Sequence, residues 1–194
     1  MVKAGGTPWS AAPAAVAARD LNSVKAACQE QLRDSDNTQA ARLVLAERRG
    51  DFVTLLYHSD TPDISAACVA RNPQGTTDVT DVDTSVGGSN GPALKAPGRG
   101  YTQGAIAQFG SPQTASITDG AVGQDVQGVT IHAGSLTVTA TVHNGRYVAW
   151  WPGAAFGKGT SLPEGDGGPA PMLTYDLTLT DGTTIWNVQP TRSS

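Results

Sequence analysis

The chain has 194 residues, of which 39% are hydrophobic and 15% are charged, and its 23 glycines and 12 prolines supply many turns. Low charge with abundant Thr, Gly and Val is more typical of a β-rich extracytoplasmic protein than of a helical cytosolic enzyme. The net charge of −4 argues against a nucleic-acid partner, because binding to a phosphate backbone requires clustered Lys and Arg.

The chain starts with MVKAGGTPWSAAPAA, a stretch rich in small residues. The sequence has neither an apolar run long enough to span a membrane nor the charged and apolar regions of a signal peptide. We expect the start to lie just after a removed signal or membrane anchor, with an ordinary cytosolic start as the alternative. The expected location is therefore extracytoplasmic, with residues 1–12 flexible and membrane attachment only through an anchor absent from this chain.

Residues 13–33 are predicted to form a helix whose apolar stripe includes Cys28. The only other cysteine, Cys68, lies on the apolar face of a strand expected at 64–71. Neither belongs to a CxxC pair, which argues against a zinc ribbon or thioredoxin chemistry. Two buried faces that each present one cysteine predict a Cys28–Cys68 disulfide, worth roughly 3–4 kcal/mol. Two free buried thiols are the alternative.

The segment ARLVLAERRGDFVTLLYHSD, residues 41–60, predicts a hairpin of strands 41–47 and 51–58 that turns at Arg49-Gly50. Residues 61–63 turn the chain into the strand at 64–71, so that 13–73 form a helix plus a three-stranded antiparallel meander. The strand FVTLLY is apolar on both faces, which predicts cover on both sides. We expect the helix to cover one side and the second half of the chain the other.

Residues 74–100 hold six glycines and show no hydrophobic period, which predicts a linker or long loop. Strand signals return at 101–110, 126–132, 136–142 and 146–152. Asn144-Gly145 is the strongest hairpin signal, because both positions of a type I′ turn need φ > 0. A last hairpin at 172–190 turns at Asp181-Gly182. The predicted fold class is α+β and β-rich: an N-terminal helix packed on a three-stranded meander, followed by an antiparallel β-sandwich-like unit at 101–194.

Two cysteines that flank an RG-turn/TLL hairpin, together with a late NGxxxAWWPG strand, resemble uncharacterised actinobacterial extracytoplasmic proteins, which are usually membrane-anchored. The matching positions are Cys28, Arg49, Gly50, Thr54, Leu55, Leu56, Cys68, Asn144, Gly145, Ala149, Trp150, Trp151, Pro152, Gly153, Asp181 and Gly182. The AWWPG stretch is the most specific part. This resemblance implies a location and an architecture, but no catalytic residue.

The sequence has no HExxH, HxH, CxxC or phosphate-binding loop, and the stretch GGSNG at residues 87–91, which fits GxSxG by its letters, is interpreted as an ordinary loop. We therefore expect no metal site, no cofactor and no enzymatic activity. Asp78, Asp81 and Asp83 are spaced like calcium ligands but lack the glycine and third ligand of an EF-hand, which favours a solvated acidic linker. Arg49-Gly50-Asp51 spells the adhesion tripeptide RGD, and a tight hairpin that needs Gly50 is the favoured interpretation.

Trp150 and Trp151 are the first candidates for ligand contact, because sugar rings stack on exposed aromatic planes. Adjacent residues of a strand point to opposite faces, so the two indoles cannot form one platform. Core packing is the favoured interpretation. The alternative is binding through one exposed Trp, with Tyr147 on the face of Trp151, and with Trp186, Tyr175 or Phe156 beside it.

The function that the sequence favours is a non-catalytic binding or sensing module of a bacterial cell envelope, with a cell-wall glycan or an envelope protein as the expected class of partner. One alternative is a carbohydrate- or cell-wall-binding module that uses an exposed Trp. Another is a hydrolase whose site is assembled from dispersed residues such as His58, Asp60 and Ser65, for which a deep pocket with a His–carboxylate contact would be evidence.

Overall fold

A computed structural model describes residues 2–4, 7–33, 35, 38–109, 114–156 and 171–191. The helices are α1 (Ala18–Leu32) and the short 3-10 helix η1 (Thr38–Ala40). The strands are β1 (Val2–Ala4), β2 (Thr7–Trp9), β3 (Arg42–Arg49), β4 (Phe52–Asp60), β5 (Asp63–Arg71), β6 (Thr80–Ser89), β7 (Ile106–Phe109), β8 (Ala115–Ala121), β9 (Val126–Ala133), β10 (Leu136–Thr139), β11 (Thr141–His143), β12 (Arg146–Pro152), β13 (Leu173–Leu179) and β14 (Thr184–Ile185). The α+β, β-rich fold class is confirmed.

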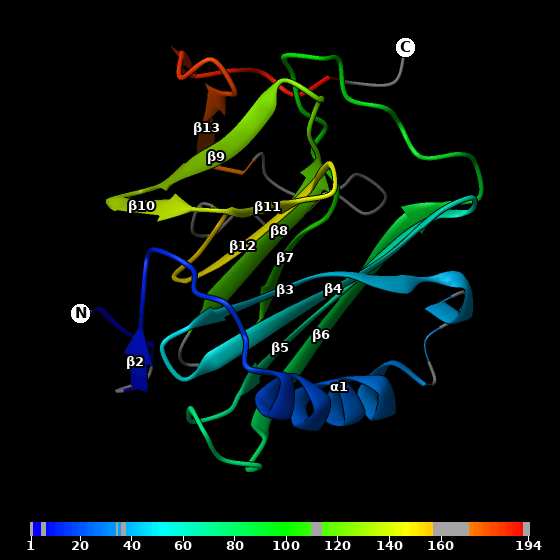
Figure 1. Cartoon of the computed structure of the whole chain (residues 1–194), viewed down its shortest axis with the longest axis vertical. Helices are drawn as coiled ribbons and strands as arrows, with labels where there is room; N and C mark the ends of the chain where they lie inside the picture. The colour runs from blue at the N-terminus through cyan, green and yellow to red at the C-terminus, as the bar shows by residue number, and fades with distance from the viewer. Residues whose placement is uncertain are drawn as a thin grey trace.

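Four layers make up the fold, and Figure 1 shows them stacked from α1 at the bottom to β9, β10 and β13 at the top. Next to the helix lies the inner sheet, with strand order β3-β4-β5-β6. The middle sheet follows in the order β11-β12-β8-β7, and the outer sheet in the order β10-β9-β13-β14. All pairings within these three sheets are antiparallel.

The helix packs on the inner sheet through the stripe that the sequence predicts. Val24, Cys28 and Leu32 are buried in one cluster with residues of β4 and β5. Cys28 and Cys68 form a disulfide with their Cα atoms 5.9 Å apart, so the predicted bridge is confirmed and the alternative of two free thiols is wrong. The helix begins at Ala18 rather than at residue 13, because Ala14 is extended and exchanges two backbone hydrogen bonds with Arg48.

Strand β4 is buried on both faces, as its sequence predicts. Val53 and Leu55 face the helix, whereas Leu56 belongs to the larger core cluster between the inner and middle sheets. Full burial of each such side chain stabilises the fold by about 1.5–3 kcal/mol. The second half of the chain therefore supplies the cover for the second face.

The expected linker at 74–100 contains strand β6, which pairs with β5 from Asp63↔Ser89 to Arg71↔Thr80. The meander thus has four strands rather than three. This strand was not predicted because its side chains, such as those of Asp81 and Asp83, are polar and show no apolar alternation. An edge strand exposed to water does not need that alternation, since backbone hydrogen bonds to its neighbour stabilise it. The prediction of a linker or long loop over the whole of 74–100 is corrected accordingly.

The expectation of a flexible start at 1–12 is also corrected. Strands β1 and β2 form a small hairpin, and Trp9 is only 1% exposed. Its ring packs edge-on against that of Trp150, with centroids 6.2 Å apart. Trp9 is therefore part of the core.

The C-terminal unit is a sandwich of the middle and outer sheets, and its parts at 110–113, 157–170 and 192–194 lie outside the described residues. The expected strand 136–142 divides at Ala140, so that β10 pairs with β9 in the outer sheet and β11 pairs with β12 in the middle sheet. Asn144 and Gly145 have φ of 49° and 73°, as the predicted type I′ turn requires.

Candidate functional site

The predicted ligand contacts on β12 are buried. Trp150 and Trp151 are 1% and 0% exposed, and Tyr147 is equally buried. Trp150 lies against Phe52 of the inner sheet, with ring centroids 4.7 Å apart, while Tyr147 lies against Tyr175 of the outer sheet at 6.4 Å. Trp150, Trp151 and Tyr147 are therefore core residues on the two faces of the middle sheet. The prediction that they contact a ligand is corrected.

Trp186 is the remaining candidate of that group, and it is 72% exposed. Tyr175, one of the expected neighbours, is buried and stacks on Tyr101 instead. No aromatic pair within the described part of the chain includes Trp186. A sugar-binding platform of several rings is therefore not assembled there.

His58, Asp60 and Ser65 lie close together at the end of the inner sheet. His58 Nε2 is 3.0 Å from the Asp60 carboxylate, and His58 is paired in register with Ser65 across β4 and β5. The Ser65 hydroxyl, however, donates to the buried carboxylate of Asp119 on β8 rather than to His58. A nucleophile needs a hydrogen bond to its base for activation, so this arrangement does not form a nucleophilic pair.

Asp119 is buried between the inner and middle sheets. Burial raises the pKa of its carboxyl, and the hydrogen bond from Ser65 and the charge of Arg146 offset only part of that rise. Arg146 on β12 approaches the Asp119 carboxylate to 3.5 Å. Neither residue could be identified from the sequence, because Arg146 follows a turn signal and Asp119 is far from both partners along the chain.

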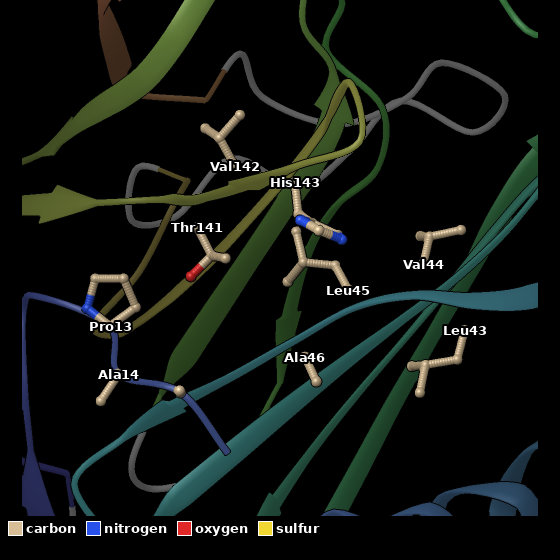
Figure 2. A pocket seen from close by; sticks show the side chains of 10 residues that line it. Pro13, Ala14, Leu43, Val44, Leu45, Ala46, Thr141, Val142 and His143 are labelled. Atoms are coloured by element: carbon tan, nitrogen blue, oxygen red, sulfur yellow. The ribbon is translucent and has the colours of Figure 1, made fainter. Parts of the chain in front are cut away.

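A groove lies where β3, an edge strand of the inner sheet, faces β11, an edge strand of the middle sheet. Its volume is about 560 Å³. Figure 2 shows Thr141 and His143 pointing from β11 toward β3, and Leu45 pointing from β3 toward them. The full lining is Pro13, Ala14, Ala15, Leu43, Val44, Leu45, Ala46, Thr141, Val142 and His143.

The backbone of β3 is open along this groove. Arg48 exchanges two 2.9 Å hydrogen bonds with Ala14, which shows that its N–H and C=O point away from β4. Two residues earlier, Ala46 directs its own N–H and C=O the same way. Among the described residues, Ala46 has no backbone partner on that side. The groove therefore presents apolar side chains together with an unpaired strand edge.

A buried ion pair lies beside the groove, next to its lining residues Ala46 and Thr141. Arg49 Nε and Nη2 donate to the two carboxylate oxygens of Glu47 at 2.6 and 2.9 Å. Glu47 also accepts from Thr141 of β11 at 2.6 Å, and Arg49 donates to the carbonyl of Thr139 at 2.6 Å. This network fixes β3 against the strand opposite. Because Arg49 is fully buried, it is not available as part of an adhesion tripeptide.

Comparison with protein families, curated proteins and solved structures gave no match. Within the part of the chain that the structure describes, no helix is both long and apolar enough to cross a bilayer. The case for a function therefore depends on the geometry of the groove and of the interlayer residues.

Proposed function

We propose that this protein is a non-catalytic binding module of the bacterial cell envelope, and that the groove between β3 and β11 holds its ligand. The open edge of β3 at Ala46 carries this proposal. An unpaired strand edge beside an apolar groove is the arrangement by which β-strand addition recognises an extended peptide.

The ligand that fits this groove is an extended segment of an envelope protein rather than a glycan. Ala14 already forms an antiparallel bridge with Arg48, so the edge accepts polypeptide backbone. The chain then turns away into α1, and β3 from Ala46 toward Leu43 stays open. A bound strand would direct every second side chain into the space between Leu45 and the wall formed by Thr141 and His143.

The extracytoplasmic location belongs to the same proposal. The Cys28–Cys68 disulfide supports it, since disulfides persist in oxidising compartments and are rare in the cytosol. The resemblance of the AWWPG strand and RG-turn hairpin to actinobacterial envelope proteins supports it as well.

The test is selection of binders from a phage-displayed library of random peptides, followed by affinity measurement with the selected peptides. Ala46→Pro removes the outward backbone donor at the groove, and we expect it to weaken binding by about tenfold or more, since at least one hydrogen bond is lost and the ring obstructs the edge. Thr84→Pro makes the matched change on β6, the opposite edge strand of the same sheet, and should leave binding intact. Equal loss in both variants, or no selected peptide, would contradict the proposal.

A further inference from the structure

Three arginines of the described chain are largely buried, and two of them have structural partners for their guanidinium groups. Arg49 donates five hydrogen bonds, to Glu47 and to the carbonyls of Ser10, Ala11 and Thr139. Arg48 donates four, to Asp20, Asn72 and the carbonyl of Gly50. These two side chains hold the fold together and have little capacity for a ligand.

Arg146 differs from both. Its side chain is only 13% exposed, yet it makes no hydrogen bond to another described residue. The nearest carboxylate oxygen, on Asp119, is 3.5 Å away, and the buried Arg146 Nε has no partner. Burial of a guanidinium with its donors unsatisfied is unfavourable, so this arrangement needs a further reason.

A cavity of about 220 Å³ adjoins Arg146, and its polar lining includes Asp63, Ser65 and Thr102. The Thr102 hydroxyl accepts from the backbone N–H of Ala121 at 3.1 Å, and its own proton has no acceptor among the described residues. Asp63 forms no ion pair within the described chain. The cavity thus offers one cation, one carboxylate and free hydrogen-bonding capacity.

Glycines bring the walls of this cavity together. A Cβ at Gly88 would lie 1.9 Å from the carbonyl oxygen of Asp63, and one at Gly120 would lie 2.1 Å from that of Thr102. A cavity of 150 Å³ in another protein holds benzene, so 220 Å³ has room for a molecule of about six to ten heavy atoms. That size excludes a sugar chain or a peptide.

We propose that this cavity binds a small α-amino acid as a zwitterion, with its carboxylate on Arg146 and its ammonium group on Asp63. A guanidinium binds a carboxylate through two parallel hydrogen bonds, which Arg146 has free to donate. Asp119 does not compete for them, because it accepts from Ser65 and its distance from Arg146 exceeds that of a normal hydrogen bond. This site is separate from the peptide groove between β3 and β11.

Thermal unfolding of the whole protein in the presence of glycine, alanine, serine and valine tests the proposal, each at about 50 mM to detect millimolar affinity. At ten times its Kd, a bound amino acid should raise the Tm by about 3 °C. Propionate and ethylamine, which are alanine without its amino or its carboxyl group, should each give less than half of the alanine shift. A shift from propionate equal to that from alanine, or no shift from any amino acid, would overturn the proposal.

Variants locate the site. Arg146→Gln and Asp63→Asn should each weaken alanine binding at least about tenfold in calorimetry, since each removes a charge-assisted contact. Arg42→Gln changes an exposed arginine of β3 and should leave the affinity unchanged. Circular dichroism establishes that each variant is folded before titration. If folded Arg146→Gln binds alanine as tightly as the original protein, the assignment is wrong.

Discussion

The space between the inner and middle sheets has a buried arginine beside an acidic residue toward each of its two edges. The two arginines differ in how many of their hydrogen-bond donors have partners. At the β3 and β11 edge, Arg49 and Glu47 satisfy one another and the neighbouring backbone, and the remaining groove is apolar. Toward β6 and β7, Arg146 lies beside Asp119 without a hydrogen bond, and the cavity is polar. The comparison shows that burial alone does not make an arginine structural. Arg49 holds the layers together because its guanidinium N–H groups have protein acceptors. Arg146 lacks such acceptors among the described residues and is therefore the one that can receive a ligand.

Loss of the Arg49 guanidinium should have the largest effect on stability. Arg49→Ala leaves the buried Glu47 carboxylate without its counter-charge and frees three backbone carbonyls. We expect the free energy of unfolding to fall by about 3–5 kcal/mol, as for other broken buried ion pairs. Urea denaturation measures the change, and the exposed Arg42→Ala should stay within about 0.5 kcal/mol. A loss below about 1 kcal/mol for Arg49→Ala would refute the contrast between the edges.

Replacement of Arg146 should have a smaller effect on folding. Arg146→Gln breaks no hydrogen bond to the described residues and removes only an ion-pair contact at 3.5 Å. The expected loss is about 1–2 kcal/mol, which reflects the uncompensated charge of Asp119. The same urea experiment compares the two variants directly. An effect as large as that of Arg49→Ala would make Arg146 a structural residue and weaken the case for a ligand beside it.

The pH dependence of stability should report the burial of Asp119. Because burial raises its pKa in the folded state, the folded protein binds this proton more tightly than the unfolded chain. The resulting stability is complete below the unfolded value near 3.8 and is lost as pH rises through the folded pKa. Asp119→Asn removes this dependence, so the original protein should lose stability relative to the variant as pH rises from 3.8. Unfolding of the original protein and of Asp119→Asn, measured from pH 3 to 8, checks this, and a stability difference that stays constant over this range would contradict it.

Apolar pattern predicted the parts of the fold that depend on a buried face. The helix stripe at Cys28, the two apolar faces of β4 and the opposite orientations of Trp150 and Trp151 all follow from local periodicity. Strand β6 and the N-terminal hairpin could not be predicted in this way, because their order depends on pairing partners or, for Trp9, on a distant ring. The division of strand 136–142 at Ala140 likewise depends on how two sheets meet.

The candidate sites were largely invisible in the sequence. Trp150 and Trp151 were candidates because they are aromatic. The groove, in contrast, is lined by Leu, Val and Ala side chains that are common in any core, and its distinguishing feature is the unpaired backbone of β3. His58, Asp60 and Ser65 do lie together, but the partner of Ser65 is Asp119, which no spacing rule connects to it. Arg146 was unremarkable beside the Asn-Gly turn, since sequence shows charge but not whether the donors of a side chain are satisfied.

The packing of Trp9 against Trp150 makes the burial of Trp9 depend on strand β12, which lies far along the chain. Strands β3 to β6 pair with neighbours in sequence and close only short loops, so they can assemble early. Trp9 cannot reach its final environment until β12 has brought Trp150 into place, which requires contacts between distant parts of the chain. We therefore expect Trp9 to become buried late in folding, after β12 has brought Trp150 into place.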